Sequence, residues 1–167
     1  MAGVKIAGTI DFRHDGTNDI VISRPRWTLE TSVDVMRWYQ MHASYFGARF
    51  QDKKDVIVVN DAFDVSPKVG TLWGQYRARL HESYIRFSVR VNNNARVRLT
   101  TNTSAARYSI SALECASVEE AIAAIVGARQ VNDSVNKGVN DSGTRLSRSL
   151  KAPESSRSQK ARSSEGT

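Results

Sequence analysis

Cysteine, histidine and long apolar runs are scarce in this chain, and each shortage excludes a class of protein. The 167 residues include one cysteine, Cys115, and three histidines. One cysteine cannot form an internal disulfide, so a reducing, cytoplasmic compartment is the expected location. No stretch of about eighteen apolar residues is present, and we therefore expect no transmembrane segment. The N-terminal residues also lack the apolar core of a secretory signal.

The sequence patterns of common cofactor sites are missing as well. His14, His42 and His81 stand apart, without the spacing typical of a zinc site, and we expect each of them on the surface. Two glycine-rich patterns are common in phosphate-binding loops, Gly-x-Gly-x-x-Gly and Gly-x-x-x-x-Gly-Lys-Ser/Thr. Neither pattern follows an expected strand in this sequence. We therefore expect no metal and no cofactor, and we interpret Cys115 as a buried structural thiol.

Positive charge is in excess, with 24 Lys and Arg against 17 Asp and Glu. Much of it falls in residues 77–107, which contain seven arginines and one acidic residue, Glu82. The arginines can solvate the outer faces of a helix and a strand, or they can attract phosphates. An alternative function is therefore a basic nucleic-acid-associated protein that uses Arg77–Arg107 and the C-terminal tail. The seven are Arg77, Arg79, Arg86, Arg90, Arg96, Arg98 and Arg107.

The composition changes after Gln130, where Ser, Asn, Arg and Lys replace aromatic and large aliphatic residues. A segment of this composition buries too little apolar surface to offset the entropy lost on ordering. The sequence therefore predicts a folded domain at 1–130 and a disordered, basic Ser/Arg-rich tail at 131–167. The tail is interpreted as a weak electrostatic contact, a phosphorylation platform or a solubilising segment.

Hydrophobic periodicity predicts alternating strands and helices in the first domain. A hairpin is expected around the turn at 14–19, with its second strand ending near Pro25. Thr31 has the side chain and position of a helix N-cap, with Asp34 in the first turn. Residues 55–60 form a β-branched run that is typical of a strand buried on both faces.

The second half of the domain continues the alternation. Residues 85–91 alternate as a strand, and residues 92–107 are compatible with either a short helix or a return strand. A last strand is expected at 108–113, and Ser117 begins a capping box before a final helix. The order predicts an α/β fold with a small, mostly parallel or mixed sheet of four to five strands and crossover helices.

The loop after the buried strand, at 60–67, carries the most distinct chemical pattern. Ser66 precedes Pro67, and proline suits the first position of a helix. Backbone N–H groups and the helix dipole would stabilise a phosphate on Ser66, although plain helix capping explains the same residues. Asp61 and Asp64 in this loop leave an uncharacterised enzyme as the weakest alternative.

The element order and the run Phe63–Ser66 resemble the STAS-like family of bacterial regulators, which includes anti-sigma-factor antagonists. The resemblance covers roughly residues 4–128. In that family a serine in an Asp-Ser-Ser-Gly-type loop is phosphorylated by a kinase that also binds the protein. The resemblance implies that Ser66 is the phosphoacceptor candidate. Pro67 stands where the family has glycine, so a phosphorylation switch and a fixed binding module both stay open.

The same resemblance implies a non-enzymatic, cytoplasmic regulatory or adaptor module. Its partner would be a protein, either a kinase or an anti-sigma-type regulator, and its oligomeric state is open. The contact surface would combine the loop with the exposed side of the following helix. The expected partner-binding residues are Asp61, Asp64, Ser66, Lys68, Thr71, Gln75 and Arg79.

Overall fold

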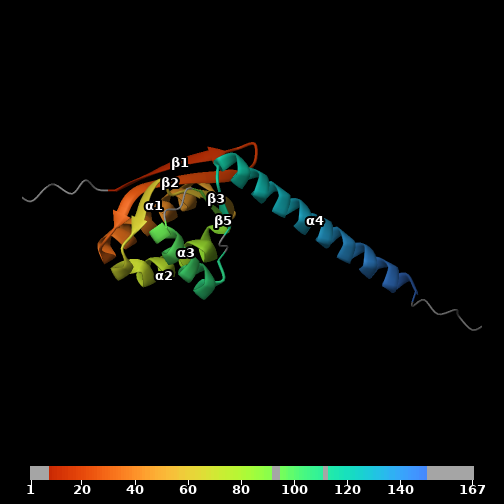
Figure 1. The fold of residues 1–167 in the computed structure, drawn as a ribbon. Helices are drawn as coiled ribbons and strands as arrows, with labels where there is room; N and C mark the ends of the chain where they lie inside the picture. Colours follow the sequence, from red (N-terminus) through yellow and green to blue (C-terminus); the bar gives the residue numbers. More distant parts are fainter. Residues whose placement is uncertain (1–7, 92–94, 111–112, 150–167) are drawn as a thin grey trace, which may run out of the picture. The chain divides into compact units, whose positions relative to one another are not determined.

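The computed structural model describes residues 8–91, 95–110 and 113–149 (Figure 1). The chain divides into two units, residues 1–129 and 130–167. The elements are β1 (Thr9–Asp15), β2 (Ile20–Leu29), α1 (Ser32–Arg49), β3 (Lys54–Val59), β4 (Ala62–Val65), the short 3₁₀ helix η1 (Pro67–Val69), α2 (Gly70–Ser83), β5 (Ile85–Val91), α3 (Ala95–Tyr108), β6 (Glu114–Cys115) and α4 (Val118–Ser149).

The strands form one mixed sheet in the order β1-β2-β3-β5-β6, with β4 also paired to β2. Among the described strands, the β1–β2 pair is antiparallel and the other pairs are parallel. Parallel neighbours need crossover connections, which α1, α2, α3 and the intervening loops supply. The predicted α/β class is therefore confirmed, with six strands in place of the expected four to five.

Strand β2 is longer than the sequence predicted, because it continues through Pro25 to Leu29. Residues 20–23 pair with β3, and residues 26–29 pair with β4. On the edge that faces β3 and β4, Pro25 falls between the two paired segments, so its missing N–H removes no hydrogen bond from these two ladders; on the other edge it lies opposite Ile10 of β1. This position explains why a proline is tolerated in an interior strand.

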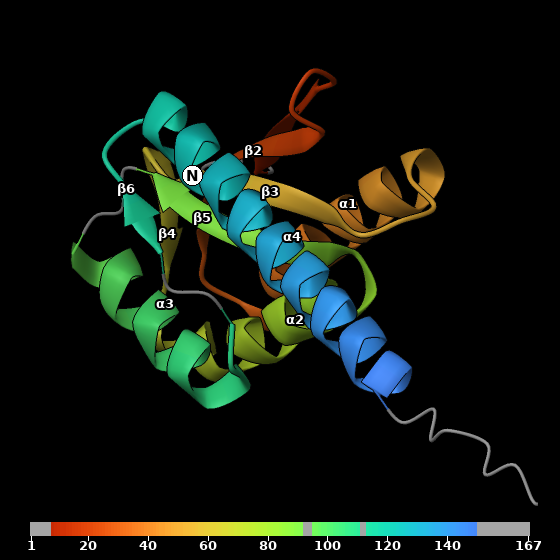
Figure 2. The same ribbon diagram turned by 90° about the vertical axis from the view of Figure 1, so that its right-hand side faces the viewer.

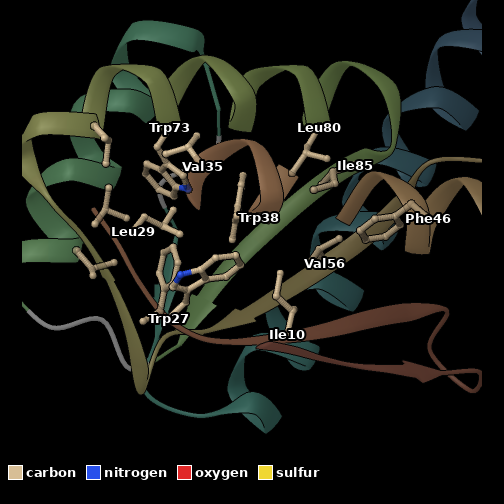
Figure 3. Packing of buried hydrophobic residues seen from close by; sticks show 14 of the residues in the cluster. Ile10, Trp27, Leu29, Val35, Trp38, Phe46, Val56, Trp73, Leu80 and Ile85 are labelled. Atoms are coloured by element: carbon tan, nitrogen blue, oxygen red, sulfur yellow. The ribbon is translucent and has the colours of Figure 1, made fainter. Parts of the chain in front are cut away.

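Helices cover both faces of the sheet. Helices α1, α2 and α3 lie on one face, and the first turns of α4 lie on the other (Figure 2). The consecutive residues Val56 and Ile57 of β3 belong to the two opposite hydrophobic clusters, and both are fully buried. The prediction of a strand buried on both faces is confirmed. Figure 3 shows the larger cluster, which lies between α1, α2 and the sheet.

The segment left open between helix and strand is helical from Ala95 to Tyr108. Val97, Thr101 and Ala105 follow one another at intervals of four, and all three are buried. The predicted strand at 108–113 is wrong, because Tyr108 ends α3 and the strand β6 is Glu114–Cys115. Ser109 has φ 53°, the left-handed conformation in which helices commonly end.

Ser117 caps α4, as the sequence predicted, and Glu120 completes a variant of the capping box with the residue before the cap. Glu120 N–H donates to Ser117 Oγ at 3.1 Å, and Ala116 N–H donates to the Glu120 carboxylate at 2.8 Å. The helix continues to Ser149, whereas the sequence placed the start of a disordered tail at residue 131. Extending a helix that has already formed avoids the cost of nucleation. This explains why residues 131–149 continue the helix although their helix propensity is low. Residues 150–167 lie outside the described residues.

Candidate functional site

Strand β4 and η1 position Ser66, where the sequence analysis expected a loop. Ser66 N–H donates to Leu29 O at 2.9 Å, so the end of β4 is fixed to the end of β2. Ser66 is the N-cap of η1, and its Oγ accepts from Lys68 N–H at 3.4 Å. Pro67 occupies the first helical position, as predicted. The backbone around Ser66 is therefore held on both sides, while its side chain is half-buried.

Four of the expected partner-binding residues are exposed on η1 and α2. Thr71, Gln75 and Arg79 recur at intervals of four and occupy one exposed face of α2, with Lys68 one turn before them. The Arg79 guanidinium lies over the Tyr76 ring, 5.1 Å from its centroid. The structure therefore brings these residues together in an exposed strip, defined as Lys68, Thr71, Gln75 and Arg79.

The two acids of the expected site have separate contacts. Asp61 is exposed and lies 4.0 Å from Arg24 Nε on β2. Asp64 lies within β4, where its Oδ1 accepts from Val65 N–H at 2.8 Å. Neither acid lines the groove or the cavity described below. The structure therefore does not bring Asp61 and Asp64 together in either of these two places.

A groove of about 280 Å³ lies between α2 and α3, next to Ser66. Gly74 permits the close approach of the two helices, because a Cβ there would lie 3.1 Å from Ser104 Cβ. At its α3 side stands Leu99, the most exposed large apolar side chain in the described part of the chain at 72%. The groove residues are Pro67, Gly70, Thr71, Gly74, Leu99, Thr100, Thr103, Ser104, Arg107 and Tyr108.

The α3 half of this groove was missed by the sequence analysis. A surface that depends on α3 could not be assigned while residues 92–107 were compatible with strand or helix. The available sequence signal was the spacing of Val97, Thr101 and Ala105 at intervals of four, which fits one face of a helix and places Leu99 on the opposite face.

The basic segment 77–107 does not form a single surface patch. Arg77 and Arg90 are buried, which corrects the expectation that they solvate outer faces. Arg77 Nη1 donates to Ser104 Oγ at 2.9 Å, and Arg90 Nη2 donates to Asn102 Oδ1 at 3.1 Å. Both arginines therefore connect the neighbouring elements to α3 from inside the domain.

Two further arginines of the segment are used in ion pairs. Arg86 binds Asp55 through two hydrogen bonds of 2.9 and 2.7 Å. Arg98 binds Glu114 in the same bidentate way, at 3.1 and 3.0 Å. Bidentate pairs neutralise charge locally, so Arg86 and Arg98 present less positive potential than the sequence suggested.

Of the histidines expected on the surface, His42 is buried in the interior and His81 is partly buried. His42 Nδ1 donates to Trp38 O at 2.9 Å, which leaves Nε2 to accept from the Ser23 hydroxyl at 3.0 Å. Burial lowers the pKa of His42 to about 4. Burial, and then the charges of Arg77 and Lys53, lower the pKa of His81 to about 3. Both imidazoles are therefore neutral at pH 7.

These histidines line an interior cavity of about 40 Å³. It is bounded by α1, α2, α3 and the strands β3, β4 and β5. No local sequence pattern indicates this cavity, because its polar residues are far apart in the chain. Its polar and aromatic lining comprises Trp38, His42, Asn60, Phe63, Trp73, Arg77, His81, Ser88, Arg90 and Thr101.

The described residues contain no group of three or more His, Cys, Asp or Glu side chains placed to hold a metal ion. No helix within the same residues is both long and apolar enough to cross a bilayer. Cys115 is buried, as expected, and burial together with the charge of Glu120 raises the pKa of its thiol.

Comparison with known protein families finds no match, and comparison with curated proteins finds none either. Among solved structures, the chain is similar to the anti-sigma factor antagonist SpoIIAA in its unphosphorylated form. The TM-score is 0.47 and the sequence identity is 20%, over 71% of this chain and 97% of that chain.

Proposed function

We propose that this chain is a non-enzymatic, cytoplasmic regulatory module of a bacterium that binds a protein partner through the loop and helix around Ser66. The observation that carries the proposal is the continuity of two surfaces. The exposed strip on η1 and α2 shares Thr71 with the α2–α3 groove, and the groove ends at the exposed Leu99. A partner that contacts Ser66 can therefore also reach an apolar anchor.

The residue types of this surface suit protein recognition. Interfaces combine a few apolar, aromatic or arginine side chains with a polar rim. Leu99, Arg107 and Tyr108 supply the first kind on α3, and the exposed strip supplies the second. The strip and the groove sit on regular helices, so a partner can dock without rearranging the core.

The surroundings of Ser66 support binding over catalysis. A nucleophilic serine needs a base within hydrogen-bond reach. The Ser66 hydroxyl instead accepts from the backbone of its own helix, and neither His42 nor His81 lines the groove beside it. These contacts favour a recognition role for Ser66.

Two modes of action are compatible with this surface. A phosphate on Ser66 would add about two negative charges at the start of η1, beside Lys68, and would change the potential that a partner meets. Alternatively, Ser66 is a helix cap inside a surface that binds constantly. Pro67 makes the backbone after Ser66 rigid in both modes.

The proposal is tested by affinity capture of partners from a nuclease-treated bacterial lysate, using matched variants. Ser66→Asp adds charge at the cap, whereas Ser66→Asn keeps a capping oxygen without charge. Leu99→Asp removes the apolar anchor, and Leu99→Ala keeps the position apolar. Thr17→Asp adds the same charge in the β1–β2 turn, at the end of β2 opposite β4.

A discrete protein held by wild type and by Thr17→Asp, and lost with Leu99→Asp, is the expected result. Loss with Ser66→Asp but not with Ser66→Asn would identify the switch, and retention by both would identify the fixed module. If Leu99→Asp and Ser66→Asp both retain the partner as well as wild type does, the proposal that the partner binds this surface is refuted. Capture that disappears with nuclease would favour the nucleic-acid alternative.

A further inference from the structure

Strand β1 lies at one end of the sheet, and β2 is its only partner among the strands that the structure describes (Figure 1). It pairs with β2 along its full length, from Thr9 to Asp15, without a shift in register. It also contains no proline. The outer edge of such a strand carries backbone donors and acceptors that another strand can use. β1 therefore has the length and regularity needed to extend the sheet.

The position of Pro25 indicates which backbone groups of β1 face away from β2. Pro25 has no N–H, and it lies opposite Ile10. An antiparallel ladder alternates between residue pairs that exchange hydrogen bonds and pairs that do not, and proline suits the second kind. By this alternation Ile10, Phe12 and His14 direct their N–H and C=O groups to the outer edge. These three residues thus offer donors and acceptors to a further strand.

The side chains of β1 alternate between two environments. Phe12 is half-buried, and its ring stacks on that of Tyr45 of α1 with 4.1 Å between the centroids. Asp11 and Arg13 are exposed on the opposite face. Asp11 Oδ2 lies 3.5 Å from Arg26 Nε, in a pair whose two side chains are both exposed. Exposed pairs are weak, so the Asp11 carboxylate is also available to a second cation.

We propose that β1 pairs with β1 of a second copy of this chain, antiparallel and about a two-fold axis at Phe12, to form one continuous sheet. This axis places Phe12 opposite itself and Ile10 opposite the partner subunit's His14. These residues direct their backbone groups to the outer edge, so the two strands can exchange hydrogen bonds. On the exposed face, the axis places Asp11 opposite the partner subunit's Arg13, and by symmetry the ion pair occurs twice.

Charge selects this register over its neighbours. A shift of two residues places Asp11 opposite itself in one direction and Arg13 opposite itself in the other. Opposite charges stabilise a directly facing cross-strand pair, whereas like charges destabilise it. Charged side chains can also protect an edge from pairing, but repulsion between two copies would require like charges at facing positions. The opposite signs at residues 11 and 13 therefore favour pairing, and the two-fold axis closes the assembly at two copies.

Sedimentation velocity of the full chain over a concentration series tests the proposal, and wild type is expected to pass from monomer to dimer. Arg13→Asp and Asp11→Arg each turn both ion pairs into repulsions. Each should raise the dissociation constant of the dimer by about tenfold or more. The double variant Asp11→Arg/Arg13→Asp restores opposite charges in the same register and should dimerise as wild type does. Arg79→Asp, a matched charge reversal on the exposed face of α2, should leave the dimer unchanged.

Hydrogen exchange measured by NMR locates the contact. The Phe12 amide should exchange more slowly in the dimer than in the monomer, whereas the Arg13 amide, which is directed toward β2, should change little. A chain that stays monomeric throughout the series would overturn the proposal, as would unchanged exchange of Phe12 in a dimer. A dimer that tolerates both single variants, or a double variant that does not dimerise, would refute the charge-selected register.

The pairing uses none of the residues of the exposed strip or of the α2–α3 groove. Failure of the partner-capture experiment and failure of the dimer are therefore distinguishable, because the variants fall on different elements.

Discussion

Arg129 Nε donates to Asp55 Oδ2 at 2.7 Å, although the two residues are 74 positions apart in the chain. Arg129 also donates to the backbone carbonyls of Asn18 and Asp19, at 2.6 and 3.1 Å. One guanidinium therefore fastens α4 to β3 and to the turn of the β1–β2 hairpin. Asp55 is almost fully buried and also binds Arg86, so it balances charge from two elements.

Replacing Asp55 with Asn is expected to destabilise the domain by about 2–3 kcal/mol, because Arg86 and Arg129 lose their shared carboxylate. The figure is below that of a fully buried pair, since Arg86 is 53% exposed and its charge stays hydrated. Asp11→Asn is the control, because Asp11 and Arg26 form an exposed pair at 3.5 Å. Urea unfolding measures both, and equal free energies of unfolding would contradict the prediction.

Stability should decrease as the pH falls from about 6.5 to 4, because His42 is buried as a neutral imidazole. In the unfolded chain His42 binds a proton near its ordinary pKa of 6.5, whereas in the folded domain its pKa is lowered to about 4. The unfolded state therefore binds more protons in this window, at a cost of about 3 kcal/mol for one group.

Chemical unfolding at a series of pH values measures this slope. His42→Gln keeps a polar side chain at the position and should flatten the part of the slope that belongs to His42. A wild-type free energy of unfolding that is constant from pH 6.5 to 4 would refute the neutral, buried state of His42.

The helix caps at Thr31 and Ser66 should differ in their contribution to stability. Thr31 and Asp34 form a complete capping box, in which Asp34 N–H donates to Thr31 Oγ1 at 3.2 Å and Thr31 N–H donates to Asp34 at 2.8 Å. Ser66 makes one longer contact of 3.4 Å to a single turn of 3₁₀ helix. Thr31→Ala should cost about 1–2 kcal/mol, and Ser66→Ala about 0.5 kcal/mol.

Thermal unfolding of the two variants, side by side, tests this order. A larger loss for Ser66→Ala would mean that Ser66 has a structural role beyond capping, and the binding results at Ser66 would then need a stability correction.

Gly74 and Gly127 should respond in opposite directions to an added side chain. At Gly74 a Cβ would lie 3.1 Å from Ser104 Cβ and 3.2 Å from the Tyr108 ring, so Gly74→Val should cost about 1–3 kcal/mol. At Gly127 no atom lies within 4 Å of the built Cβ, and Gly127→Ala should stabilise α4 by about 0.5–1 kcal/mol. Melting temperatures of both variants measure the difference, and a neutral Gly74→Val would contradict the close α2–α3 contact.

Local sequence signals predicted the parts of the fold that depend on neighbouring residues. The hairpin, the Thr31 cap, the β-branched strand β3 and the capping box of α4 each follow from a few consecutive side chains. Long-range pairing overrode the local signal at Pro25, where the strand continues because two partners share β2. For the candidate site, the residues on η1 and α2 were predicted from the sequence, whereas the contribution of α3 to the groove was not.

The sequence by itself determined the alternation of strands and helices, because periodicity and caps act within one turn or one strand. Only the tertiary structure decided which polar residues are interior. His42, Arg77 and Arg90 are polar residues that the sequence placed at the surface. Packing of α1, α2 and α3 on the sheet nevertheless encloses them. Their burial depends on contacts between residues distant in sequence, which no local pattern records.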